Sequence, residues 1–205
     1  PRAEEGTTMR AYVGGATAVS QDFTKVISDA LPVFLAVVIG LGFLALMLLF
    51  RSLLVPLIGA LTSLLSLGAA LGVVTAVFQW GWGASLLGVT ATGPIMPFLP
   101  IMVFAILFGL SMDYQVFLVS RMHEEWHHTG DNALSVRRGL AGSGRVVAIA
   151  AAIMASVFLA FIPTPEDTIK LFGVGLATAV LVDAFIVRLV LVPSLISWIG
   201  PRTWW

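Results

Sequence analysis

The chain contains no cysteine, and it has few charged side chains for its length. The absence of cysteine excludes structural disulfides and thiolate-bound metal, but it does not identify the compartment. Charged residues make up only 11% of the 205 residues, whereas hydrophobic residues make up 59%. An ordinary globular protein has about 25% charged residues, so the composition excludes a soluble domain of the usual kind. The net charge of zero gives no indication of partners, and we expect no nucleic acid among them.

The apolar residues are concentrated in five long runs. Each run approaches the ~20 residues that a helix needs to cross a bilayer. A transmembrane barrel would instead require apolar and polar residues to alternate, so these runs predict helices. The fold class is therefore an all-α, polytopic membrane bundle of about five transmembrane helices. The runs cover residues 27–50, 53–78, 97–120, 146–162 and 170–192, and an interfacial tail extends from the last run to Trp205.

The arginines predict how the bundle is oriented in the membrane. If the five spans alternate in direction, six arginines fall on one side: Arg51, Arg121, Arg137, Arg138, Arg145 and Arg202. The opposite loops, 79–96 and 163–169, contain neither lysine nor arginine. The positive-inside rule places the arginine side in the cytoplasm. We therefore expect a multi-pass protein of the cell membrane, with its N-terminal segment extracytoplasmic and its C-terminus cytoplasmic.

Two polar segments lie outside the apolar runs. We interpret residues 1–24 as the tail of an extracytoplasmic domain and residues 25–205 as the transmembrane domain. Residues 121–145 form a long cytoplasmic loop that is charged and helix-like, with a break at Gly130, Asp131 and Asn132. This pattern predicts an amphipathic interfacial helix on the cytoplasmic face. Because the chain begins with Pro1 rather than methionine, we expect it to be a piece of a longer protein.

Asp113 is a carboxylate inside an apolar run, eight residues before Arg121. At ~1.5 Å per residue it lies about 12 Å into the membrane, near the middle of a ~30 Å hydrocarbon core. A charge at that depth costs at least about 2.5–3.5 kcal/mol, so such a residue is a candidate functional site. An apolar environment favours the neutral carboxyl, which can release its proton when water or a cation arrives. Asp113 is therefore a candidate proton relay; the alternative is a permanently protonated carboxyl that only packs against a neighbouring helix.

Three neighbours of Asp113 complete this candidate site. Tyr114 follows it directly, and its hydroxyl can hydrogen-bond a carboxylate on another helix. Phe117 lies one turn beyond Asp113 on the same helix face, and Gly109 lies one turn before it. The glycine leaves room for a second helix to approach. A phenylalanine on a helix face is usually a packing residue, so Phe117 is assigned only a supporting role.

The last apolar run contains a second pair of charged residues, Asp183 and Arg188. In an α-helix, a spacing of five residues leaves them about 140° apart, which is poor geometry for a direct pair. We therefore expect Asp183 to find a polar partner on a neighbouring helix. We expect Arg188 to extend its side chain towards the cytoplasmic boundary. Both residues are possible intramembrane polar partners of the relay.

Residues His123 to His127 match the H-E-x-x-H signature of zinc proteases, in which two histidines bind metal and Glu124 would activate water. Asp183 is conceivable as a third ligand. Against this reading, the motif begins after Arg121, at the water boundary, and Asp183 lies at a different depth. A charged run at this position is typical of a solvated helix end. We therefore expect no metal and no cofactor, and an intramembrane zinc metalloprotease stays an alternative.

One stretch resembles a known family. Gly-Leu-Ser-Met-Asp-Tyr-Gln-Val-Phe-Leu-Val-Ser-Arg-Met-His-Glu-Glu (109–125) is similar to the tenth-helix signature of the MMPL (mycobacterial membrane protein large) transporters, within the resistance-nodulation-division superfamily. Residues 12–18 resemble that family's segment before its eighth helix, and residues 182–193 resemble its twelfth. The resemblance implies that the five spans correspond to helices eight to twelve, the C-terminal transmembrane half. Residues 1–24 would then end a porter-like domain.

The resemblance also implies a function. Such proteins use the proton-motive force to export lipids, glycolipids, siderophores or drugs. An Asp-Tyr pair in their fourth helix faces a pair in the tenth, which Asp113 and Tyr114 match, and Phe117 matches a phenylalanine beside it. The expected partners are therefore the missing N-terminal half, membrane lipids and a hydrophobic or lipid substrate. A non-transporting sensor or scaffold on the same fold is a further alternative.

Overall fold

The computed structural model describes residues 15–90, 92–93 and 95–204, with the side chains of residues 16 and 17 excepted. Five helices are long and apolar enough to cross a membrane, which confirms the predicted fold class. The last of these is built from consecutive helical segments of different type. The elements are α1 (Ala16–Phe50), α2 (Leu54–Phe78), α3 (Leu99–Thr129), α4 (Asn132–Leu159), α5 (Asp167–Leu181), η1 (Val182–Leu191), α6 (Val192–Ile199) and η2 (Gly200–Trp204).

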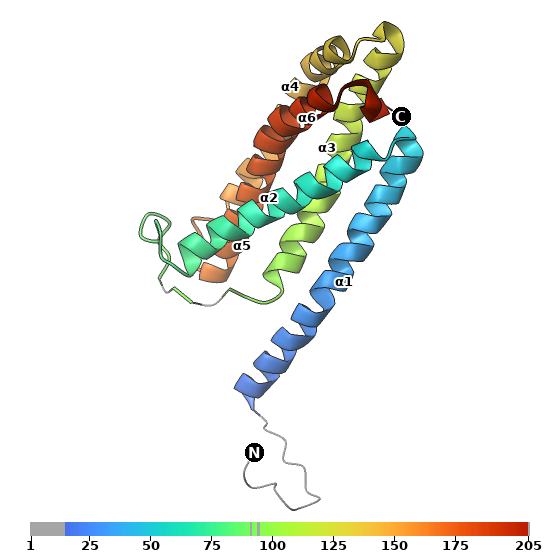
Figure 1. Cartoon of the computed structure of the whole chain (residues 1–205). Helices are drawn as coiled ribbons and strands as arrows, with labels where there is room; N and C mark the ends of the chain where they lie inside the picture. Colours follow the sequence, from blue (N-terminus) through green and yellow to red (C-terminus); the bar gives the residue numbers. More distant parts are fainter. Residues whose placement is uncertain (1–14, 91, 94, 205) are drawn as a thin grey trace, which may run out of the picture.

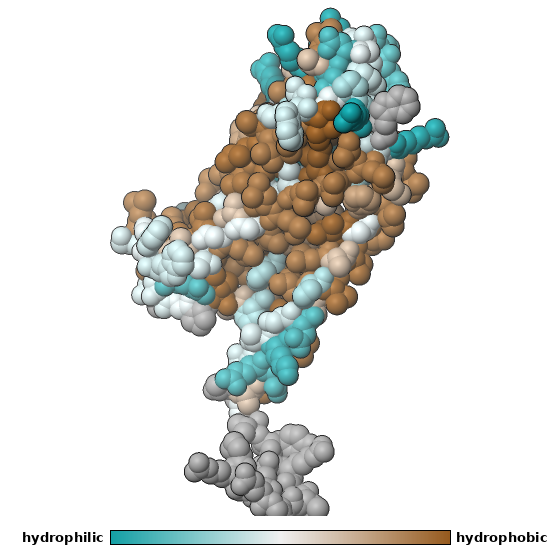
Figure 2. All heavy atoms as spheres, viewed as in Figure 1, coloured by the Kyte–Doolittle hydropathy of each residue, from teal (hydrophilic) through white to brown (hydrophobic). Residues whose placement is uncertain are grey.

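The helices run back and forth and form one elongated bundle (Figure 1). The turn from α1 to α2, the turn from α3 to α4 and the C-terminal segment η2 meet at one end. Hydrophobic side chains cover the middle of the visible face, and hydrophilic ones gather at this end (Figure 2). An apolar belt between polar ends is the surface that a bilayer requires. The molecule is therefore built as a multi-pass membrane protein.

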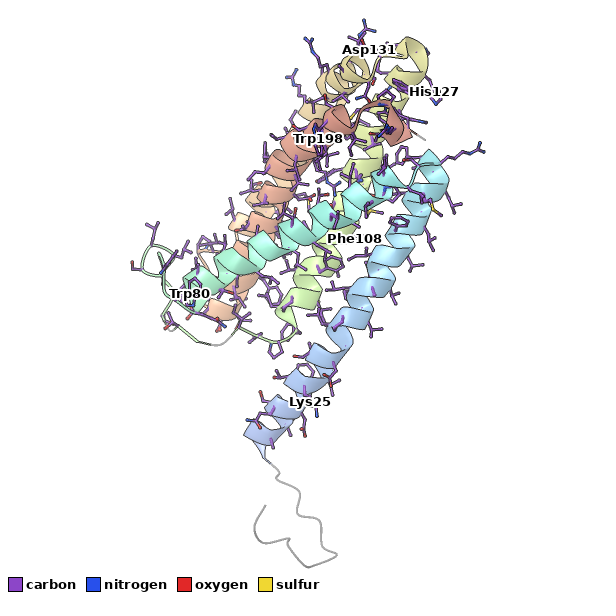
Figure 3. All side chains as sticks on the ribbon, in the orientation of Figure 1. Lys25, Trp80, Phe108, His127, Asp131 and Trp198 are labelled. Atoms are coloured by element: carbon purple, nitrogen blue, oxygen red, sulfur yellow. The ribbon has the colours of Figure 1, made fainter. Side chains whose placement is uncertain are left out.

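The first helix, α1, is longer than a membrane span. Its 35 residues include Pro32, which has no N–H to donate to the carbonyl of Ser28. The α1 side chains that pack against the buried cores begin at Phe34 and continue to Phe50. The N-terminal part of α1, where Figure 3 labels Lys25, extends beyond the other helices (Figure 1). Only the second half of α1 is therefore held by the bundle.

Helices α3 and α4 pack together as a hairpin. The break predicted at residues 130–132 is confirmed: Gly130 ends α3 with φ 65°, and the Asp131 side chain caps α4 by accepting a hydrogen bond from the Leu134 N–H. The predicted interfacial helix is wrong, because residues 121–145 continue α3 and begin α4 without a separate helix. The hairpin is closely packed: a Cβ at Gly139 would lie 2.8 Å from the backbone N and Cα of Met122.

The connection between α2 and α3 is fastened to the start of α5. Lys170 is only 5% exposed, and its ammonium donates to the carbonyl of Gly88 and lies 3.3 Å from Oδ1 of Asp167. The other oxygen of Asp167 accepts hydrogen bonds from the N–H and hydroxyl of Thr90, at 3.2 and 2.5 Å. These contacts hold the loop at the end of the bundle away from the α1–α2 and α3–α4 turns (Figure 1). The end with these two turns, the first containing Arg51 and the second following Arg121 in the sequence, is called the arginine-rich end.

The buried side chains form two apolar clusters along the bundle. The first joins residues such as Leu67, Phe104 and Val180, and the second joins residues such as Ile58, Leu118 and Val187. Along both α2 and α3, the residues between the two clusters include buried polar side chains. The core is therefore interrupted at about its middle by a polar layer.

Candidate functional site

The polar layer consists of six buried side chains from three elements: Ser63 and Ser66 of α2, Ser111 and Gln115 of α3, and Asp183 and Arg188 of η1. Each is at most 2% exposed. Burial of a charged pair in a membrane protein is tolerated only where every charge is paired or hydrogen-bonded. The layer satisfies this requirement through contacts among its own members.

Asp183 and Arg188 bind each other directly. Nε of Arg188 lies 3.3 Å from Oδ2 of Asp183. The prediction that a spacing of five residues is poor geometry for a direct pair is wrong, because residues Val182–Leu191 form a π-helix. In a π-helix the N–H groups bond five residues back, so residues five apart lie one above the other. Local helix type therefore creates the ion pair.

The remaining polar atoms of the pair are bound by the neighbouring helices. Ser66 donates its hydroxyl to Oδ1 of Asp183 at 3.0 Å, which confirms the predicted partner on another helix. The guanidinium of Arg188 donates to Oε1 of Gln115 and to the hydroxyls of Ser111 and Ser63. Arg188 is 0% exposed, so the prediction that it extends to the boundary is wrong. Its charge is satisfied inside the bundle instead.

Asp113 lies on the other side of α3. It is exposed, as are Gly109 one turn before it and Phe117, which is 40% exposed, one turn after it. Ser111 and Gln115 are each two residues from Asp113, or about 200° around the helix, and face inwards. The three predicted residues therefore share one outward face of the bundle, while the polar layer lies behind the same helix.

Tyr114 occupies an intermediate position. It is half-buried and packs against the first apolar cluster. Among the described residues, the hydrogen-bonded polar layer includes neither Asp113 nor Tyr114. The structure therefore brings Asp183 and Arg188 together, and the hydrogen bonds of this pair do not extend to the predicted relay residues.

Four members of the polar layer were missed by the sequence reasoning. Ser63 and Ser66 are three residues apart, and Ser111 and Gln115 are four apart, so each pair shares one helix face. Polar residues at helical spacing inside an apolar run were the available signal. It is a weak signal, because a serine in such a helix can also satisfy its hydroxyl on its own backbone.

The histidines of the H-E-x-x-H motif lie near the arginine-rich end of the bundle, where Figure 3 labels His127 and Asp131 opposite Trp80. The rings of His123 and His127 are 4.5 Å apart, and His123 also packs near Phe50 and Trp204. Within the described residues, no three or more His, Cys, Asp or Glu side chains form a group that could hold a metal. Asp183, which the sequence analysis considered as a third zinc ligand, is instead bound to Arg188.

The fold and the polar layer define a polytopic helical membrane protein with charged side chains inside its membrane-spanning part. The model of the MMPL family matches residues 1–205, and the chain belongs to this family. It is 45% identical to membrane protein YdfJ of Bacillus subtilis, over 94% of this chain and 27% of that protein. It is 40% identical to heme uptake protein MmpL11 of Mycobacterium tuberculosis H37Rv, over 94% of this chain and 20% of that protein. It is 36% identical to trehalose monomycolate exporter MmpL3 of Mycolicibacterium smegmatis, over 95% and 19%.

The chain spans about a fifth to a quarter of the length of these relatives.

Proposed function

We propose that this chain is the C-terminal membrane half of a proton-driven transporter that exports lipids or other hydrophobic small molecules across the cell membrane. In this proposal Asp113 and Tyr114 are one side of an intramembrane proton relay. The missing N-terminal half supplies the helix that faces them. The arginine-rich end of the bundle lies in the cytoplasm, and the N-terminal end of α1 lies outside.

The observation that carries the proposal is the exposure of Asp113 on the outward face of α3. Charged groups in a membrane helix face protein or water rather than lipid, because an ionised carboxylate in hydrocarbon costs several kcal/mol. Gly109 and Phe117 flank Asp113 on this face, and the glycine has no other atom within 4 Å of where a Cβ would stand. A small residue beside a polar one is the pattern of a helix–helix contact in membranes. The face therefore suits a partner helix.

In the proposed mechanism, Asp113 is protonated from the outside and deprotonated to the cytoplasm. The neutral carboxyl donates a hydrogen bond, whereas the carboxylate only accepts, so its bonding to the facing helix differs between the two states. Tyr114 can donate its hydroxyl to a carboxylate on that helix. A proton flux would in this way alternate two helix arrangements and drive the external domains that hold substrate.

The substrate class is inferred from the relatives. One is named for export of trehalose monomycolate and another for heme uptake. Both are large, largely apolar molecules, which agrees with a hydrophobic cargo but does not select one. The family membership favours transport over the intramembrane protease and over the non-transporting sensor or scaffold.

The test is Asp113→Asn in the full-length protein. The amide keeps the size of the side chain but cannot carry a proton between two charge states. We expect transport to be lost while the protein still folds and inserts, as measured by cargo export from cells and by the amount in the membrane. Asp29→Asn, an exposed carboxylate on α1, is the matched control and should leave export unchanged. Export retained by Asp113→Asn would refute the relay.

A further inference from the structure

Gln115 connects the proposed relay helix to the last span. It lies two residues after Asp113, about 200° around α3, and it is 1% exposed. Helix α3 therefore carries a carboxylate on its outward face and a buried amide on its inward face. The proposed relay assigns no role to this amide.

The side chain of Gln115 uses both its acceptor and its donor. Its Oε1 accepts a hydrogen bond from Nη1 of Arg188, and its Nε2 donates to the carbonyl of Val55 in α2 at 3.2 Å. Gly59 makes room for it, because a Cβ there would lie 2.8 Å from Cδ of Gln115. Gln115 thus joins α2, α3 and η1 at one point.

Arg188 reaches this point only because η1 is a π-helix. If residues Val182–Leu191 were α-helical, Asp183 and Arg188 would be about 140° apart and could not pair. In the observed structure Asp183 binds Nε of the guanidinium, while Gln115 and Ser111 bind its other two nitrogens. The guanidinium is therefore held from both sides, and these bonds favour the π form of η1 over the α form.

We propose that Gln115 is a positioning residue that holds Arg188 and keeps η1 in the π form, so that movement of α3 is passed to the last span. The inference builds on the proposed function, in which α3 moves when Asp113 changes its protonation. When α3 shifts, the acceptors of Arg188 shift with it. Arg188 either follows or is released, and release lets η1 relax to the α form and turns the residues that follow.

The form of η1 can be measured by cross-linking two introduced cysteines, because this sequence contains no cysteine of its own that would compete. A Cβ at Gly144 of α4 would lie 3.4 Å from Cδ2 of Leu189 in η1. Leu189 lines a groove together with Leu140 of α4, which lies one turn before the buried Gly144, and the reagent approaches the pair from this groove. Relaxation of η1 to the α form would rotate position 189 away from position 144.

The experiment uses the full-length protein, kept free of other cysteines, with Gly144→Cys and Leu189→Cys and a short bifunctional methanethiosulfonate reagent. Gln115→Met, which keeps the length but removes the acceptor, should lower the cross-linked fraction by about threefold or more. Gln115→Glu restores an acceptor for Arg188 and should restore cross-linking. The control pair, Val74→Cys with Gly175→Cys, joins α2 to α5 ahead of η1 and should be unaffected.

Two further variants complete the design. Gln79→Met changes an exposed glutamine at the end of α2 and should leave the 144–189 cross-link unchanged. Ser111→Ala removes the other α3 acceptor of Arg188 with a smaller change, and it should lower cross-linking if Gln115→Met does not accumulate in the membrane. Equal cross-linking with and without these acceptors would overturn the inference.

The cross-link does not depend on transport, so the two proposals can fail separately. If Asp113→Asn still exports cargo while Gln115→Met loses the cross-link, the relay is refuted and the positioning role stands. If Asp113→Asn abolishes export while the cross-link never responds to Gln115, the relay stands and the positioning role is refuted.

Discussion

Asp183 and Arg188 are five residues apart in one helix and still form an ion pair, with Nε and Oδ2 at 3.3 Å. Arg188 is 0% exposed and Asp183 is 2% exposed, so neither charge can be satisfied by water. Two charges in this position are tolerated only together. The consequences can be measured without knowledge of the substrate.

Removal of one partner should destabilise the protein strongly, whereas removal of both should be milder. Arg188→Met leaves a buried carboxylate without its cation, and we expect a loss of about 3–5 kcal/mol. The double variant Asp183→Asn with Arg188→Met should recover a large part of this loss. Unfolding of the purified full-length protein in nanodiscs measures both. Additive losses in the double-mutant cycle would show that the two groups do not interact.

The crossing of α3 and α4 depends on the absence of a side chain at Gly139. Gly139→Ala places a methyl group 2.8 Å from the backbone of Met122, which cannot rotate away, so we expect a loss of about 1–3 kcal/mol. Gly142→Ala is the matched control, because no atom lies within 4 Å of its Cβ position. It should be neutral or slightly stabilising, since alanine favours helix. Equal melting temperatures for the two variants would contradict this packing.

The loop between α2 and α3 should become more mobile when the contacts of Lys170 are removed. Lys170→Met loses the bonds to Gly88 and Asp167, and we expect amide exchange in residues 86–90 to quicken by about tenfold. Hydrogen exchange read by mass spectrometry measures this locally. The sequence contains one other lysine, Lys25, which is exposed on α1, and Lys25→Met serves as the control. Unchanged exchange in Lys170→Met would show that other contacts hold the loop.

The H-E-x-x-H motif should prove dispensable for metal and for transport. His123→Phe keeps a ring in contact with Phe50 and Trp204, and we expect it to leave export unchanged. Glu124→Gln breaks only an exposed pair with Arg121, worth about 0–1 kcal/mol. Metal analysis of the purified full-length protein should find no stoichiometric zinc. Bound zinc together with loss of function in Glu124→Gln would favour the protease instead.

The transmembrane bundle was predictable because lipid leaves the backbone few choices. A run of about twenty apolar residues must satisfy its own hydrogen bonds, so the spans follow from composition. The break at Gly130 was also predictable, since glycine adopts the positive φ that ends a helix. The interfacial helix was wrong because a charged helical pattern in residues 121–145 does not reveal whether the helix lies along the membrane or continues straight out of it.

The site was predictable only in part. Asp113 stands out in the sequence because any carboxylate in an apolar run is costly. The pairing of Asp183 with Arg188 was not predictable, because the residue pattern of this run does not distinguish a π-helix from an α-helix, and the helix form changes which residues share a face. Gln115 was missed for a similar reason: its importance comes from Arg188, which is 73 residues away in the sequence.

Helix α1 has the geometry of a lever arm. Its 35 residues measure about 52 Å, but among the described side chains those that pack against the buried clusters begin at Phe34. Pro32 marks the pivot, because the missing hydrogen bond there softens the helix. A swing of about 10° at this pivot carries Ala16, roughly 24 Å away, through about 4 Å. A small rotation of α1 about Pro32 would therefore produce a much larger displacement at Ala16 than at Phe34.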